Sequence, residues 1–100
     1  MTTTTPTLVE PSSVLAACCA RVLFFGRIAD VCGRSLAVSI PSRGCSLDDL
    51  KGLVAEQVDG AAAALGQPGV RVAIDQAMTR GAAWVSPGQE VAFLPAFSGG

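Results

Sequence analysis

The sequence has 100 residues, 50% hydrophobic and 15% charged, with a formal net charge of −1 and no histidine. This length predicts one domain with a single core, and the charge balance excludes a basic footprint for nucleic acid. Without histidine, Ser-His-Asp and Cys-His catalysis are excluded within the chain, which also lacks the commonest metal ligand. No apolar stretch reaches membrane-spanning length, so no membrane is expected, and the apolar excess predicts surface that a partner covers.

Four cysteines occur, and none belongs to a Cys-x-x-Cys pair. Neither a zinc site nor thioredoxin-like redox chemistry is therefore indicated. We expect four reduced thiols in a cytoplasmic protein and no metal. The cysteines are Cys18, Cys19, Cys32 and Cys45.

Residues 1–18 are expected to form a disordered N-terminal arm. They contain four consecutive threonines and show no apolar periodicity. The arm carries no Lys or Arg, so it does not resemble a secretory signal peptide. A domain at residues 19–95 and a flexible tail at residues 96–100 complete the expected division.

Two strands are predicted first. Residues 20–26 are apolar on both alternating faces, which predicts a central strand. Residues 27–34 are predicted to be a connection, with Gly33 as its turn signal. Residues 35–40 alternate between apolar and small polar side chains, which predicts a half-exposed strand paired with the first as an antiparallel hairpin.

A helix follows, with Ser46 as its N-cap and Asp49 in the capping-box position. Gly60 is expected to end it, and residues 61–65 to form a further short helical turn. Gly52 inside a helix costs about 1 kcal/mol relative to Ala, so we expect close packing on the sheet as compensation. One apolar stripe at helical spacing consists of Leu47, Leu50, Val54 and Val58.

The last third is predicted to return to the sheet. Residues 70–74 alternate, and a short strand is expected around Met78. Pro87 followed by Gly88 indicates a type II turn. Residues 91–94 are an apolar run that predicts a final strand, and Pro95 should end its pairing because proline has no N–H.

One helix can cover only one face of this sheet. The first and last strands are nevertheless apolar on both faces, so something must cover the second face or it is an exposed interaction patch. Phe25, Met78 and Leu94 are the candidates for that patch.

The sequence ends in Ser98, Gly99 and Gly100. A glycine end has no Cβ, so it can thread a narrow channel and present its carboxylate to another protein's active site. Once that carboxylate is activated, for example by adenylation, a sulfur nucleophile would leave a thiocarboxylate and an amine would leave an amide. We expect this carboxylate to be the working group of the protein.

Several of these features together resemble the ubiquitin-like β-grasp fold, and more specifically the MoaD family of molybdopterin synthase small subunits. The expected fold class is therefore α+β, with a mixed sheet packed on one main helix and a flexible C-terminal tail. The matching features are RVLFF at residues 21–25, the helix at 47–57, VAIDQ at 72–76, PGQEVAFLP at 87–95 and SGG at 98–100.

The resemblance implies a sulfur carrier that is not catalytic alone and binds no cofactor itself. An E1-like adenylyltransferase would use ATP to adenylate Gly100, and sulfur transfer would give the thiocarboxylate. In a heterotetramer with the large subunit, the carrier would convert cyclic pyranopterin monophosphate to molybdopterin. The implied site comprises Gly100 as the reacting group, Gly99 and Ser98 as threading residues, and Phe25, Met78, Leu94, Pro95 and Phe97 as the partner interface.

Three alternatives keep parts of this interpretation. The chain could carry sulfur for thiamine or cysteine biosynthesis. It could be a ubiquitin-like modifier, in which case Lys51, the only lysine, is the one lysine site for self-linked chains. It could also be a binding module with an inert C-terminus.

Overall fold

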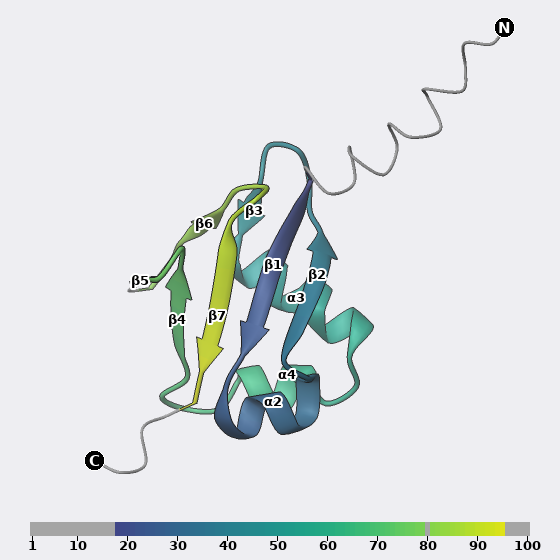
Figure 1. The fold of residues 1–100 in the computed structure, drawn as a ribbon, viewed down its shortest axis with the longest axis vertical. Coiled ribbons are helices and arrows are strands. Elements are labelled where there is room, and N and C mark those ends of the chain that lie inside the picture. Colours follow the sequence, from purple (N-terminus) through teal and green to yellow (C-terminus); the bar gives the residue numbers. More distant parts are fainter. Residues whose placement is uncertain (1–17, 80, 96–100) are drawn as a thin grey trace, which may run out of the picture.

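The computed structural model describes residues 18–79 and 81–95. These residues form a five-stranded sheet, a separate two-stranded sheet and three helices, so the expected α+β class is confirmed (Figure 1). Of the expected arm at residues 1–18, only Cys18 is described, and its carbonyl accepts a hydrogen bond from the Ile40 N–H at 2.7 Å. The expected tail at residues 96–100 lies outside the described residues.

The five-stranded sheet has the order β2-β1-β7-β4-β5. The strands are β1 (Cys19–Phe24), β2 (Ser35–Ser39), β4 (Arg71–Ile74), β5 (Ala77–Met78) and β7 (Glu90–Leu94). The first and last strands run parallel, and every other neighbouring pair is antiparallel, which includes the predicted β1–β2 hairpin. The sheet is therefore mixed, as expected, and β7 is its central strand.

Helix α3 (Leu47–Gln57) lies across one face of the sheet (Figure 1). Its predicted N-cap is confirmed, because the Ser46 side chain accepts a hydrogen bond from the Asp49 N–H at 3.0 Å. The helix ends at Gln57, three residues before Gly60. The expected packing of Gly52 is wrong, since a Cβ at this exposed position would meet nothing within 4 Å.

Helix α2 (Gly26–Cys32) stands where a connection was predicted. Ile28 and Cys32 lie four residues apart, so both face the same side of the helix, and both are buried. Gly33 follows, and its N–H donates to the Ala29 carbonyl at 2.8 Å. The predicted short helical turn is confirmed as α4 (Ala61–Leu65), which packs against α2.

The two-stranded sheet pairs β3 (Cys45–Ser46) with β6 (Trp84–Val85). Trp84 stays half exposed, and its Nε1–H donates to the Arg43 carbonyl at 3.2 Å. The loop before β3 fits this indole only because Gly44 lacks a side chain. A Cβ there would lie 2.5 Å from Trp84 Nε1 and from the Val85 carbonyl, and the φ of Gly44 is +88°.

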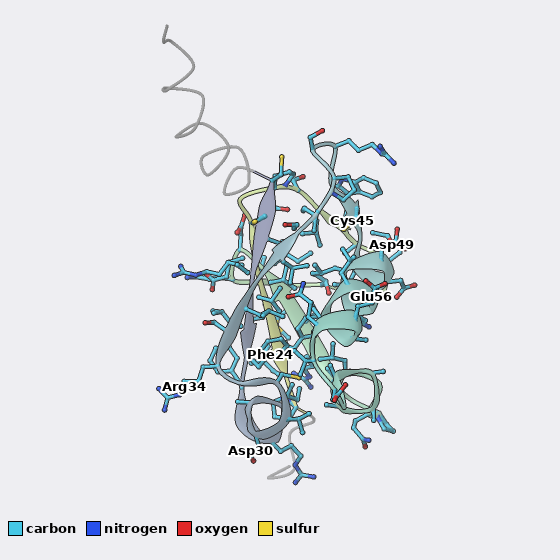
Figure 2. All side chains as sticks on the ribbon, turned by 90° about the vertical axis from the view of Figure 1, so that its right-hand side faces the viewer. Phe24, Asp30, Arg34, Cys45, Asp49 and Glu56 are labelled. Carbon is cyan, nitrogen blue, oxygen red and sulfur yellow. The ribbon has the colours of Figure 1, made fainter. Side chains whose placement is uncertain are left out.

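The core lies between the sheet and the helices. Figure 2 shows the sheet edge-on, with α3 and α4 on one side and side chains such as Phe24 and Cys45 filling the space between them. Phe24 and Phe93 stack there with ring centroids 6.0 Å apart. No described helix covers the opposite face of the sheet. β1 pairs with β2 on one edge and with β7 on the other, as a central strand should. On its uncovered side Arg21 is exposed and Leu23 is half buried.

Candidate functional site

The uncovered side of the five-stranded sheet, here called the open face, is apolar in its middle. The strand register determines which side chains share it. Leu23 lies beside Ala92 across β1 and β7, and Ala92 lies beside Ala73 on β4, which in turn pairs with Met78 on β5. Side chains alternate between the faces of a strand, so Leu94 lies on the same side as Ala92.

The three residues predicted to form an exposed patch all belong to this face. Phe25 extends the parallel ladder past the end of β1, where its N–H donates to the Phe93 carbonyl at 3.1 Å. Its backbone is extended, so its side chain follows Leu23 onto the open face next to Leu94. Phe25 is 45% exposed, Met78 is 54% exposed, and Leu94 is half buried.

Charged side chains flank the apolar middle of the open face. Arg21 and Glu90 are register partners at the start of β7, and Arg71 pairs with Leu94 near its end. The open face is therefore an apolar patch with charges on two sides, an arrangement typical of protein interfaces.

The predicted end of the last strand at Pro95 is confirmed, because β7 finishes at Leu94. The ring of Pro95 rests against Gly26, the first residue of α2. A Cβ on Gly26 would lie 2.6 Å from Pro95 Cγ, and the φ of Gly26 is +57°, so a side chain is disfavoured twice. The contact with Gly26 thus holds Pro95, the last described residue before the C-terminal segment, in place. Sequence reasoning missed this contact, because it placed Gly26 in the first strand and did not predict α2.

The start of β7 is fixed by a network centred on Asp75. Its carboxylate accepts hydrogen bonds from the Glu90 N–H at 2.9 Å and from Gln89 Nε2 at 3.0 Å. Both donors stabilise the charged form and hold the pKa of Asp75 below its usual value. The other end of the Gln89 amide accepts from the Ser86 N–H at 2.8 Å. This network connects the β4–β5 turn to the predicted turn at Pro87, and sequence reasoning did not find it.

The thiols of Cys32 and Cys45 are buried and face the core. Burial raises the pKa of both, and the charge of Asp49 raises the pKa of Cys45 further. These thiols are therefore protonated and unreactive near neutral pH. Among residues 18–79 and 81–95, no three His, Cys, Asp or Glu side chains gather closely enough to hold a metal ion.

The remaining predicted site residues are Phe97, Ser98, Gly99 and Gly100, which lie outside the described residues. The structure describes what precedes them in the chain: the central strand β7, and Pro95, which packs on Gly26. The model of the ThiS family matches residues 22–100, a span that includes all four. The chain belongs to the ThiS family.

Members of the ThiS family are β-grasp sulfur carriers that E1-like enzymes activate. The match identifies the family but not the sulfur acceptor. No curated protein matches the sequence. None of the helices in the described part of the chain is long and apolar enough to cross a membrane.

Solved structures similar to this ThiS-family chain come from Haloferax volcanii. A crystal structure of small archaeal modifier protein 1 superposes with a TM-score of 0.63 at 18% identity, covering 79% of this chain and 98% of that one. The solution structure of protein HVO 2177 gives 0.65 at 21% identity, covering 82% and 86%. These likenesses confirm the expected β-grasp fold.

Proposed function

We propose that this ThiS-family protein carries sulfur as a thiocarboxylate on Gly100 and serves as the small subunit of a molybdopterin synthase. The observation that carries the proposal is the family match, which runs through the apolar strand β7 to Gly100 itself. The carboxylate of a glycine is unhindered and can enter a narrow active site.

Loading of the carrier takes two steps. An E1-like enzyme joins the Gly100 carboxylate to the α-phosphate of ATP, releasing pyrophosphate and leaving an acyl adenylate. A sulfur nucleophile, written as hydrosulfide, then attacks the acyl carbon, so that a C–S bond forms and the C–O bond to AMP breaks. The products are the thiocarboxylate and AMP, and no change of oxidation state is needed. The enzyme supplies the acid–base groups, since the sequence contains no histidine.

Partners are proposed to bind the open face. Phe25, Met78 and Leu94 supply its apolar contacts, and Pro95 lies where β7 ends. Aromatic and methionine side chains are enriched in protein interfaces, which supports this assignment. A partner seated here lies beside the exit of the C-terminal segment, so Gly99 and Ser98 can thread into its active site with Phe97 at the entrance.

The choice of acceptor rests on the sequence. The Leu23-Phe24-Phe25 start and the Ala92-Phe93-Leu94-Pro95 end resemble molybdopterin synthase small subunits more than thiamine-pathway carriers. The acceptor is then cyclic pyranopterin monophosphate, in a heterotetramer with the large synthase subunit.

Loading is tested by intact mass spectrometry. The full chain is incubated with an E1-like enzyme, ATP and sulfide, and the expected product gains the mass difference between sulfur and oxygen. Deleting Gly100, or adding one alanine after it, should abolish the gain without changing the circular dichroism spectrum. A mass gain that persists in the deletion variant would contradict the proposal.

The loaded carrier then identifies the acceptor. With the large subunit and cyclic pyranopterin monophosphate, the proposal predicts one molybdopterin for every two thiocarboxylates consumed, because the dithiolene holds two sulfur atoms, and return of Gly100 to the carboxylate. Turnover only with a thiazole synthase, or only with a cysteine-forming acceptor, would retain the carrier function and reject the molybdopterin assignment.

A second candidate function is that of a protein modifier. It is favoured by the fold similarity to the Haloferax volcanii protein named small archaeal modifier protein 1. In that case Gly100 would form an isopeptide bond with a lysine amine. Gly100-dependent conjugates that survive denaturing gels of the native cell would support it, and their absence beside a detectable thiocarboxylate would reject it.

A further inference from the structure

We propose that a groove between α2 and α4 is a docking site for the side chain of Phe97, which anchors the C-terminal segment to this domain. The groove has a volume of about 630 Å³, within the range of ligand-sized cavities. It belongs to neither the open face nor the reacting carboxylate, and the inference is independent of the sulfur acceptor.

The groove is built from two short helices that meet at small residues. Ile28 and Val31 of α2 line one wall, and Ala63 and Ala64 of α4 line the other. Gly60, just before α4, lets the helices approach closely: a Cβ there would lie 3.1 Å from Val31 Cγ1. Small side chains on one wall thus leave a hollow that the facing helix does not fill.

The surface of this groove is apolar and accessible. Val31 is 45% exposed, although it is a branched aliphatic residue, while Ile28 is 2% exposed and forms the floor. Binding of an apolar side chain in the groove is favourable, because it removes the exposed aliphatic surface from water.

The position of Pro95 indicates which occupant. Pro95 is itself a lining residue of the groove, so the chain leaves the described structure from the groove's edge. Phe97 is only two residues further, and two residues span at most about 7 Å. It is also the only large apolar side chain among residues 96–100.

The N-terminal segment is less well placed to fill the groove. Because β1 and β7 are parallel, β1 begins at the end of the sheet opposite to where β7 finishes (Figure 1). The segment before Cys18 would therefore have to pass along the whole sheet to reach α2 and α4. Arg27, at the groove, adds a cation that favours an aromatic occupant over an aliphatic one.

Docking changes how far Gly100 can reach. Anchored at Phe97, the carboxylate extends at most about 11 Å beyond the groove, whereas five free residues after Pro95 would extend about 18 Å. An enzyme that needs the longer reach must therefore compete with the groove for Phe97.

Methyl NMR of the full chain tests the docking directly. Phe97→Ala should shift the methyl resonances of Ile28, Val31 and Val70, because the aromatic ring that shields them is lost. Ser98→Ala, one residue further along, is the matched control and should leave them in place. Equal shifts in the two variants would overturn the proposal.

A second variant fills the groove. Ala63 is exposed on α4, and leucine is a good helix former, so Ala63→Leu should fold normally. The leucine should displace Phe97 from the groove. Chymotrypsin should then cleave after Phe97 roughly tenfold faster, as expected if the equilibrium between docked and free Phe97 shifts tenfold toward the free side chain. Unchanged cleavage would overturn the proposal, as would groove shifts caused only by removing residues 1–17. Neither experiment requires the activating enzyme, so failure here is distinct from failure of the loading experiment.

Discussion

Asp75 shows how a single side chain can position a strand to which it does not belong. Its two hydrogen bonds hold the start of β7, the strand that leads to Pro95. Asp75 and Gln76 both have positive φ, at 49° and 71°, in the tight turn that brings the carboxylate under Glu90. The motif at residues 72–76 therefore has a structural role that its likeness to a family pattern did not reveal.

This role predicts a pH dependence. The pKa of Asp75 is lowered in the folded protein, so its contribution to stability is complete above the unfolded value of 3.8 and is lost as pH falls through the folded pKa. Asp75→Asn should lower the melting temperature at neutral pH. The difference from the unsubstituted protein should shrink in strong acid, where both side chains are uncharged. Thermal melts at the two pH values measure this, and a difference independent of pH would contradict it.

Among the elements, the ones that sequence periodicity predicted are those with long apolar patterns: β1, β2, α3, β4 and β7. Helix α2 was missed because it has only seven residues, its first residue, Gly26, was assigned to the preceding strand, and Gly33 after it indicated a turn. Strands β3 and β6 have two residues each, too few for any period, and are defined by their pairing alone.

Two glycines show that a local sequence pattern does not predict tertiary contacts. The sequence attributed close packing to Gly52, but the tight contacts are at Gly44, against Trp84 and Val85. The sequence around the two glycines does not distinguish them. They differ in tertiary structure, because β6 approaches the loop before β3 that contains Gly44.

The same substitution at these two positions should have opposite effects. Gly52→Ala should raise the free energy of unfolding by about 0.5–1 kcal/mol, because alanine is the better helix former at an exposed helical site. Gly44→Ala should lower it by about 1–2 kcal/mol from backbone strain alone, and by more because the Cβ meets the Val85 carbonyl. Urea denaturation of both variants measures the pair; a loss of stability in Gly52→Ala would show an undetected contact.

For the molecule as a whole, the division into a helix-covered face and an open face predicts which substitutions separate binding from folding. Sequence reasoning placed Phe25, Met78 and Leu94 on an exposed patch. The register puts Met78 and Leu94 on one face, and the extended backbone of Phe25 continues β1 onto the same face. It could not place Pro95 against Gly26 or define the groove between α2 and α4, since both depend on how separate helices meet.

Phe25→Asp should weaken binding to the activating enzyme by about 2 kcal/mol or more, roughly 30-fold in Kd, if this aromatic is central to the interface. Stability should be unchanged or higher. Phe25 is the N-cap of α2 and makes no side-chain cap, whereas Asp is a favoured N-cap. Calorimetric titration and thermal melts provide the two measurements.

Ala62→Asp is the matched control for that experiment. It adds the same charge near the N-terminus of α4, away from the sheet, where it should affect neither binding nor folding. Equal losses of affinity in the two variants would indicate a general effect of charge and contradict an interface on the open face.

The central position of β7 also affects how the protein is made. Before this strand arrives, the β1–β2 hairpin and the β4–β5 hairpin have no partner between them to join them into one sheet. β7 follows every other strand of this sheet in the chain, so the sheet can close only after all of those strands have left the ribosome. A chain cut short before residue 90 would lack the strand that closes the sheet. Such incomplete products should be open to proteases, so the pool that meets the activating enzyme should consist of molecules that contain β7.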